Sequence, residues 1–119
     1  MTYAIVVAYA KDNLDKTTIA FTLAKAALEG GHKVRLVLTS EGVRVTVKGF
    51  ADDMNNGPPF LPLKELIALV LAKGGEINVC TPCMAKRGLK QEEMIAGVTF
   101  IDGAGFVRVV GEAERTIGL

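Results

Sequence analysis

The sequence predicts an α/β protein with three layers, in which helices cover a five-stranded, mainly parallel sheet. Two observations lead to this prediction. Short apolar runs rich in β-branched residues alternate along the chain with segments whose apolar residues recur at helical spacing. The main apolar runs are also continuous rather than alternating, which is typical of parallel strands buried on both faces.

The composition sets limits on size and on function class. With 119 residues, the chain is long enough for one domain, which we assign to residues 1–119. Its formal net charge of +1 argues against a nucleic-acid groove or a basic membrane-binding patch. Only 2 cysteines exclude a disulfide scaffold. Charged residues interrupt every apolar run, and the N-terminal one lacks a preceding positive segment, so we expect a cytoplasmic protein with no membrane contact.

The first half of the chain predicts a strand–helix–strand unit. Tyr3–Ala10 is a continuous apolar run. The next segment, 14–28, has helical spacing, with Asp12 or Asn13 available as its N-cap and Gly30 as its stop. Val34–Leu38 follows as a second strand. Because the connection contains a helix, we expect the two strands to be parallel with a right-handed crossover.

The second half continues this alternation after a segment that is harder to interpret. Residues 43–48 alternate in polarity like an edge strand and contain several β-branched residues. The remaining elements that we expect are a helix from Pro62 to Gly74, a strand at Ile77–Cys80, a very short helix from Pro82 to Gly88, one or two turns over 90–96, a strand at Val98–Ile101, a helix at Ala104–Ala113 and a last strand at Arg115–Leu119.

Both cysteines lie where the predicted third strand meets the following helix. Ligand sites of open parallel sheets gather at this carboxyl edge. If Thr81 is the N-cap and Pro82 the first helical residue, the Cys83 sulfur lies near unpaired backbone N–H groups at the positive end of the helix. Lys86 and Arg87 follow at helical spacing and add positive potential. This arrangement favours a thiolate, the reactive form of cysteine.

Other chemistries have less support in the sequence. One CxxC and the lone His32 cannot supply the four ligands of a zinc site within one chain, and no glycine-rich phosphate loop follows the first strand. We therefore expect no metal and no cofactor. Glu41, after the second strand, either faces the thiols or caps a turn.

The chain resembles the DsrE/DsrF-like family, which includes TusD-type sulfur carriers. The resemblance covers the whole length and rests on three segments: Asn13–Thr17, Leu38–Val43 and, above all, Val79–Leu89 with its Cys-Thr-Pro-Cys and Arg-Gly. It implies a five-stranded parallel sheet, trimers or hexamers, and a cysteine persulfide that relays sulfur. By position, the sulfur-accepting cysteine maps to Cys80, with Cys83 as a partner thiol. It also implies a short helix at 42–49, against the strand pattern described above.

Three functions follow as hypotheses. The first is a sulfur-relay protein of the sulfurtransferase type that exchanges sulfur with donor and acceptor proteins through a persulfide on Cys80. The second is a CxxC thiol–disulfide oxidoreductase that cycles Cys80 and Cys83. The third is a non-enzymatic oligomeric module whose thiols are structural or bind metal between subunits.

The apolar content also predicts assembly. When glycine is counted and tyrosine is not, about 59% of the residues are apolar, against a usual value of about 45–50%. In Leu63–Ala72 only Lys64 and Glu65 are charged. Since one covering layer cannot bury the whole circumference of such a helix, we expect a homo-oligomer.

Overall fold

The computed structural model describes residues 1–119 and contains one five-stranded sheet in which every strand pair is parallel. The strands run in the order β4-β3-β2-β1-β5. Their bounds are β1 Thr2–Val7, β2 Lys33–Leu38, β3 Glu76–Cys80, β4 Thr99–Ile101 and β5 Arg115–Gly118. The predicted parallel α/β fold is confirmed, and the strands lie within a few residues of their predicted positions.

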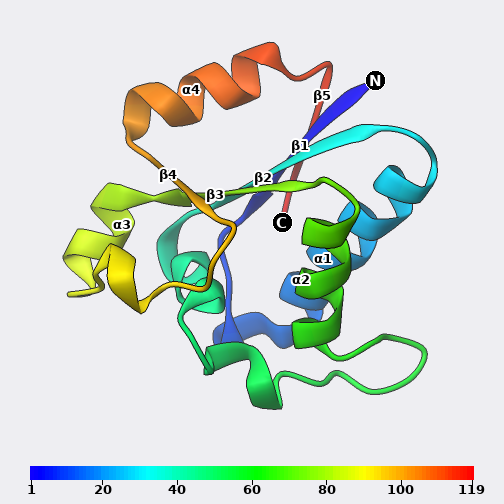
Figure 1. The fold of residues 1–119 in the computed structure, drawn as a ribbon, viewed down its shortest axis with the longest axis horizontal. Helices are drawn as coiled ribbons and strands as arrows, with labels where there is room; N and C mark the ends of the chain where they lie inside the picture. The colour runs from blue at the N-terminus through cyan, green and yellow to red at the C-terminus, as the bar shows by residue number, and fades with distance from the viewer.

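Helices cover both faces of the sheet (Figure 1). Helices α1 (Leu14–Glu29) and α2 (Leu63–Ala72) lie together on one face, and α4 (Gly103–Glu112) lies on the other. This division follows from the strand order: the chain steps outward from β1 to β4 and then returns to β5, and a right-handed crossover in the reverse direction places its helix on the opposite face. The short helix α3 (Thr81–Lys86) begins directly after β3.

The core lies between the sheet and the α1–α2 layer. Its largest fully buried side chains include Phe21 of α1, Ile5 of β1, and Leu36 and Leu38 of β2. The predicted cap of the first helix is confirmed, because the Asn13 side chain accepts a hydrogen bond from the backbone N–H of Lys16 at 3.1 Å. This packing fixes the ends of β1 and β2, from which one side of the candidate site is built.

Residues 43–48 do not form a strand. They belong mostly to η2, a 3₁₀ helix over Ser40–Thr46, and only Val47 makes an isolated bridge, to Met94. The strand interpretation was wrong because β2 already has β1 and β3 as neighbours, so the segment that directly follows it cannot pair beside it, and it joins neither edge strand, β4 or β5. The short helix implied by the family resemblance is the better description. Val43 and Val45 are instead buried in the core.

Three further 3₁₀ turns complete the chain: η1 (Lys11–Asn13), η3 (Phe50–Asp53) and η4 (Gln91–Glu93). The last corresponds to the short helical segment predicted over 90–96. None of the helices combines the length and the apolar character needed to span a membrane.

Helix α2 buries most of its apolar surface within the chain. Leu63, Leu66, Ile67 and Val70 are buried, whereas Ala68 and Ala72 are exposed. Packing against α1 and the η2–η3 stretch therefore buries more of the apolar surface of α2 than its composition alone suggested. On the opposite face, Val107 of α4 is 73% exposed.

Candidate functional site

The two cysteines lie at the carboxyl edge of the sheet, as the sequence predicts. Cys80 is the last residue of β3 and Cys83 lies in α3. The neighbouring strand β2 pairs in register with β3, so that Leu38 lies opposite Val79. The residues that follow β2 are consequently brought beside the residues that follow β3, although about 40 positions separate them in sequence.

The sulfur of Cys83 is held by the turn after β2. The backbone N–H of Ser40 donates to this sulfur at 3.2 Å, and the hydroxyl of Thr39 lies 3.4 Å from it. Hydrogen bonds of this kind favour the charged form of a thiol. The thiolate that the sequence predicts is therefore supported by the turn after β2 in addition to the start of α3.

The shape of this turn explains how the Ser40 N–H reaches the sulfur. Ser40 adopts a left-handed backbone with φ of 52°, an uncommon conformation for a residue other than glycine. The turn lies against the end of β1, since the Thr39 N–H donates to the Val7 carbonyl at 3.0 Å and the Gly42 N–H donates to Ala8 at 3.3 Å. A Cβ atom on Gly42 would stand 2.2 Å from the Val7 carbonyl oxygen. Only glycine allows this approach without a shift of the backbone.

The two thiols differ in their acidity. Burial raises the pKa of the Cys80 thiol, whose residue is 6% exposed. Partial burial would also raise the pKa of Cys83, but hydrogen bonds from Thr39 and the Ser40 N–H, together with Cys80 and the charge of Arg87, lower it overall. The site thus pairs a partly exposed sulfur that tends to ionise with a buried one that tends to stay protonated.

Arg87 connects α3 to the turn after β2. Its Nε donates to a carboxylate oxygen of Glu41, and its Nη1 donates to the Cys83 backbone carbonyl at 3.1 Å. Arg44 donates to the other oxygen of Glu41 at 3.0 Å. These bonds lower the pKa of Glu41, the one from Arg87 most. The sequence left open whether Glu41 faces the thiols or caps a turn. Through its bond to Arg87, Glu41 lies on the side of the thiol site.

Thr81 and Lys86 lie differently from what the sequence predicts. Cys80, not Thr81, is the N-cap of α3, so Cys83 is its third helical residue rather than the second. The Thr81 hydroxyl donates to the carbonyl of Ile101 at 3.1 Å and so ties α3 to β4. Lys86 is exposed and makes no ion pair. Arg87 is the basic residue whose charge acts on the Cys83 thiol.

The acidic residues that follow β1 do not reach the thiols. Asp12 accepts the Ala10 N–H at 2.8 Å, and Asp15 accepts the Asn56 side-chain amide at 2.7 Å. No group of three or more His, Cys, Asp or Glu side chains lies close enough together to hold a metal ion.

Sequence reasoning missed Thr39 and Ser40. Their position could have been predicted. Both residues directly follow the second strand, so they lie at the same carboxyl edge of the sheet as the cysteines that follow the third strand. What no sequence pattern indicated is the left-handed backbone of Ser40, which directs its N–H toward the sulfur.

Comparison with known proteins agrees with this architecture. The family model described as the DsrE/DsrF-like family matches residues 1–119, the whole chain. The chain belongs to this family. The uncharacterized protein MK0008 of Methanopyrus kandleri is 30% identical over 113 residues, which cover 95% of this chain and 89% of that protein. The uncharacterized protein MJ0989 of Methanocaldococcus jannaschii is 26% identical over 98% of both chains.

Solved structures share the fold of this DsrE/DsrF-like chain. The crystal structure of the ychN protein from E. coli superimposes with a TM-score of 0.83 at 18% identity, covering 100% of this chain and 99% of that one. The protein of unknown function MTH1491 from Methanobacterium thermoautotrophicum gives a TM-score of 0.71 at 14% identity, covering 99% and 96%. At these identities the likeness concerns the fold alone.

Proposed function

We propose that this DsrE/DsrF-like protein is a sulfur-relay protein that carries sulfane sulfur as a persulfide on Cys83, with Cys80 as the partner thiol. The observation that carries the proposal is the pair of contacts on the Cys83 sulfur, from the Ser40 N–H and the Thr39 hydroxyl. A persulfide is more acidic than a thiol and is an anion at neutral pH, so the groups that favour the thiolate also favour the loaded form.

Loading requires one displacement. The Cys83 thiolate attacks the outer sulfur of a donor persulfide R–S–SH, the donor S–S bond breaks, and R–S⁻ leaves. The products are Cys83–S–SH and a donor thiolate, with no net oxidation or reduction. Partial exposure of Cys83 gives the donor access to the sulfur. The mirror reaction, attack by an acceptor thiolate on the outer sulfur, unloads it and regenerates Cys83.

Cys80 offers a second way to unload. Its thiolate can attack the inner sulfur of Cys83–S–SH, expel HS⁻ and leave a Cys80–Cys83 disulfide, which an external dithiol must then reduce. The raised pKa of Cys80 keeps this nucleophile mostly protonated. We therefore propose that direct transfer to an acceptor protein is the main route and that sulfide release is the slower one.

The choice of Cys83 differs from the family resemblance, which assigns the sulfur to Cys80 by position. Two features favour Cys83 as the nucleophile: its lowered pKa and its greater exposure. Burial of Cys80 works against both ionisation and access. The alternatives predict opposite results for single cysteine variants.

The proposal is tested by loading the purified protein with a low-molecular-weight persulfide, removing the donor and measuring sulfane sulfur by cyanolysis. We expect close to one sulfane sulfur for each chain, and none in Cys83→Ser. A thiol–disulfide oxidoreductase, the rival function for a CxxC pair, would retain no sulfane sulfur and would instead reduce a disulfide substrate as it forms Cys80–Cys83.

We also propose that the protein acts in the cytoplasm, where free thiols persist, and that it is a homo-oligomer, a trimer or hexamer as the family resemblance implies. An apolar strip on α4 supports assembly through this helix: Val107 is 73% exposed, and exposed Ala104 and half-buried Val110 lie one turn before and after it. Donor and acceptor proteins would approach the exposed end of α3.

A further inference from the structure

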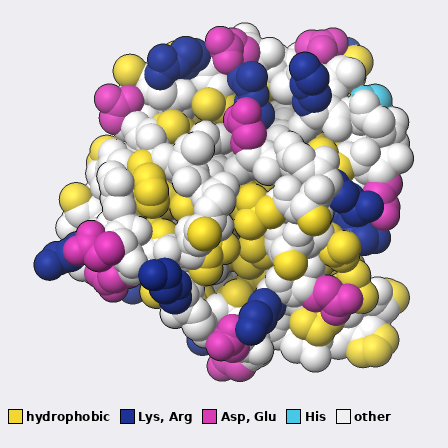
Figure 2. Space-filling model, viewed as in Figure 1, with side chains coloured by type: hydrophobic (Ala, Val, Ile, Leu, Met, Phe, Trp, Pro, Cys, Tyr) yellow, Lys and Arg dark blue, Asp and Glu magenta, His cyan; other side chains and the backbone are white.

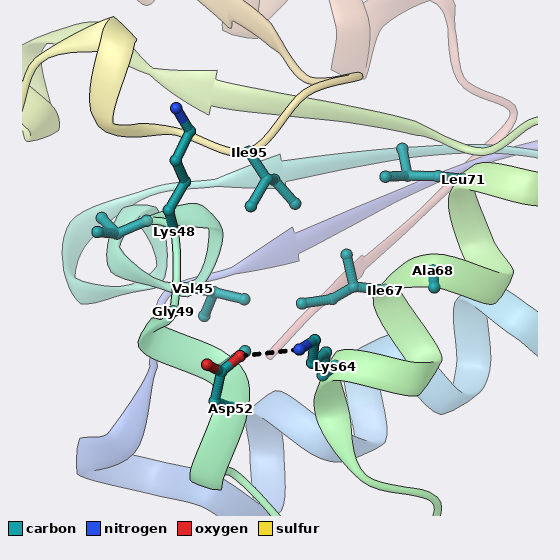
Figure 3. A pocket seen from close by; sticks show the side chains of 11 residues that line it. Val45, Lys48, Gly49, Asp52, Lys64, Ile67, Ala68, Leu71 and Ile95 are labelled. Carbon is teal, nitrogen blue, oxygen red and sulfur yellow. Dashed lines mark ion pairs between the residues drawn. The ribbon is translucent and has the colours of Figure 1, made fainter.

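A separate apolar pocket lies between the η2–η3 stretch and helix α2. Its volume is about 370 Å³. Val45 and Asp52 lie on one side, Ile67, Ala68 and Leu71 of α2 lie on the other, and Ile95 lies at one end (Figure 3). Ala51 also lines the pocket. Neither cysteine is among the lining residues. In the space-filling view, hydrophobic side chains gather in a hollow near the middle of this face, with charged side chains around it (Figure 2).

The pocket is a formed concavity rather than a flat patch. Val45 is 1% exposed and Ile67 is 5% exposed, so the floor belongs to the folded core. The stretch that carries Val45 is fixed at its far end, since the Ile95 N–H donates to the Thr46 carbonyl at 2.8 Å and the Lys48 N–H donates to Glu93 at 2.9 Å. Walls held in this way suit a preformed binding site.

The charges at the rim are unequal. Lys64 is paired with Asp52 at 3.3 Å, so these two groups nearly cancel. The Lys48 ammonium donates to the backbone carbonyl of Glu92 at 3.2 Å and has no carboxylate partner. An apolar cavity with one uncompensated cation at its edge matches a ligand with an apolar body and one negative charge.

We propose that this pocket binds a small monocarboxylate with an apolar body. Its volume of about 370 Å³ is more than twice the roughly 150 Å³ of a protein cavity that accepts benzene, which sets the ligand at the size of a medium-chain or aryl-substituted acid. The apolar body fills the slot between Val45 and Leu71. The exposed Lys48 side chain, which extends away from the slot to the Glu92 carbonyl in the unliganded protein (Figure 3), turns inward to donate a hydrogen bond to the carboxylate. This site is independent of the proposed sulfur relay and uses none of its residues.

Titration of the protein with octanoate tests the proposal. Binding is measured by calorimetry and by the chemical shifts of the Ile67 and Ile95 methyl groups in NMR spectra. We expect saturable binding that shifts these methyl signals. Octanol, which has the same apolar body and no charge, should bind roughly tenfold more weakly, as expected for the loss of one charge-assisted hydrogen bond. Lys48→Gln should weaken the binding of octanoate by a similar factor. Lys33→Gln, which changes an exposed lysine outside the pocket, should leave the affinity unchanged.

A second pair of variants tests the cavity itself. Ala68 is exposed on α2 and lines the pocket, so Ala68→Phe places a ring in the slot without disturbing the core. Ala72→Phe places the same ring one turn further along the same helix, outside the lining residues. We expect Ala68→Phe to abolish octanoate binding and Ala72→Phe to retain it, with unchanged thermal unfolding in both.

Three results would overturn the proposal. These are no saturable binding of octanoate, equal affinity for octanoate and octanol, or binding that persists in Ala68→Phe. If the first result is accompanied by loss of assembly in Ala68→Phe, the pocket is a contact between copies of the chain.

Discussion

The backbone N–H of Ser40 points at the sulfur of Cys83 across 3.2 Å. The two residues belong to different crossover segments and meet because β2 and β3 are neighbours that end at the same edge of the sheet. A backbone donor cannot be lost by most substitutions, which makes it a durable way to stabilise a sulfur anion. The neighbouring Thr39 hydroxyl, in contrast, can be removed by a single change.

Thr39→Val should raise the pKa of Cys83, because the variant loses one hydrogen bond to the thiolate and keeps nearly the same volume. A hydrogen bond to a charged group is worth about 1.5 kcal/mol, which corresponds to roughly tenfold in an equilibrium constant. At a pH below this pKa, alkylation of Cys83 by iodoacetamide should then be about tenfold slower. The measurement is the pH dependence of the alkylation rate, read from the peptide that contains Cys83.

Thr22→Val is the matched control for this variant. It also loses one threonine hydroxyl bond, to the Thr18 carbonyl at 2.8 Å, but within α1 and away from the thiols. Its alkylation profile should match that of the unmodified protein. Equal profiles for both variants and the unmodified protein would show that Thr39 does not act on the sulfur.

Gly42→Ala should lower both stability and Cys83 reactivity. The added Cβ would meet the Val7 carbonyl oxygen at 2.2 Å, so η2 must move away from β1 and carry Ser40 with it. We expect a loss of about 2 kcal/mol or more in the free energy of unfolding. Gly111→Ala, in the open surroundings of α4, should be neutral or stabilise by up to about 1 kcal/mol. Urea unfolding measures both variants, and equal stabilities would contradict the close approach.

The Glu41–Arg87 pair should contribute pH-dependent stability. Its bond to Arg87 is the main cause of the lowered pKa of Glu41 in the folded protein. A lowered pKa means that the stabilisation is present above the ordinary carboxyl pKa and is lost as the pH falls through the folded-state value. Because Glu41 is 38% exposed, we expect a coupling energy of only about 1 kcal/mol at neutral pH.

A double-mutant cycle of Glu41→Gln and Arg87→Gln measures this coupling, repeated near about pH 3, where most carboxylates are protonated. The coupling should be smaller at the lower pH, because the lowered pKa of Glu41 keeps part of the pair ionised below the ordinary carboxyl range. The Lys64–Asp52 pair, with both side chains more than half exposed, gives the comparison and should show a smaller coupling at neutral pH. A coupling that does not depend on pH would contradict an ionic Glu41.

Assembly should depend on the exposed face of α4. Sedimentation equilibrium of the unmodified protein should give a mass that is a multiple of the 12.6 kDa chain. Val107→Glu should shift the equilibrium toward the monomer, because it places a charge in an apolar contact. Arg108→Glu, at the next and also exposed position, tests whether any acidic change on α4 has this effect. A monomeric unmodified protein would refute the assembly proposal.

The fold could be predicted from the sequence because parallel strands buried on both faces give continuous apolar runs, as in Tyr3–Ala10 and Val34–Leu38. The cysteine pair could be placed at the carboxyl edge for the same reason. The strand prediction for residues 43–48 was wrong because local alternation does not reveal which position in a sheet a segment can take. That depends on the strand order, in which β1 and β3 flank β2 and the edges are formed by β4 and β5.

The details of the site depend on contacts between distant segments, and these left no local pattern. Glu41 reaches Arg87, and Ser40 reaches Cys83, only because the ends of β2 and β3 come together. The opposite acidities of the two thiols follow from their burial and partners in the fold and could not be read from the CxxC spacing.

Peptide mass spectrometry after persulfide loading locates the carried sulfur. We expect the added mass of one sulfur atom to lie on Cys83, to persist in Cys80→Ser and to be absent in Cys83→Ser. We also expect less sulfide release from loaded Cys80→Ser, which lacks the internal nucleophile. An adduct that persists in Cys83→Ser and disappears in Cys80→Ser would refute the Cys83 persulfide and assign the sulfur to the buried thiol.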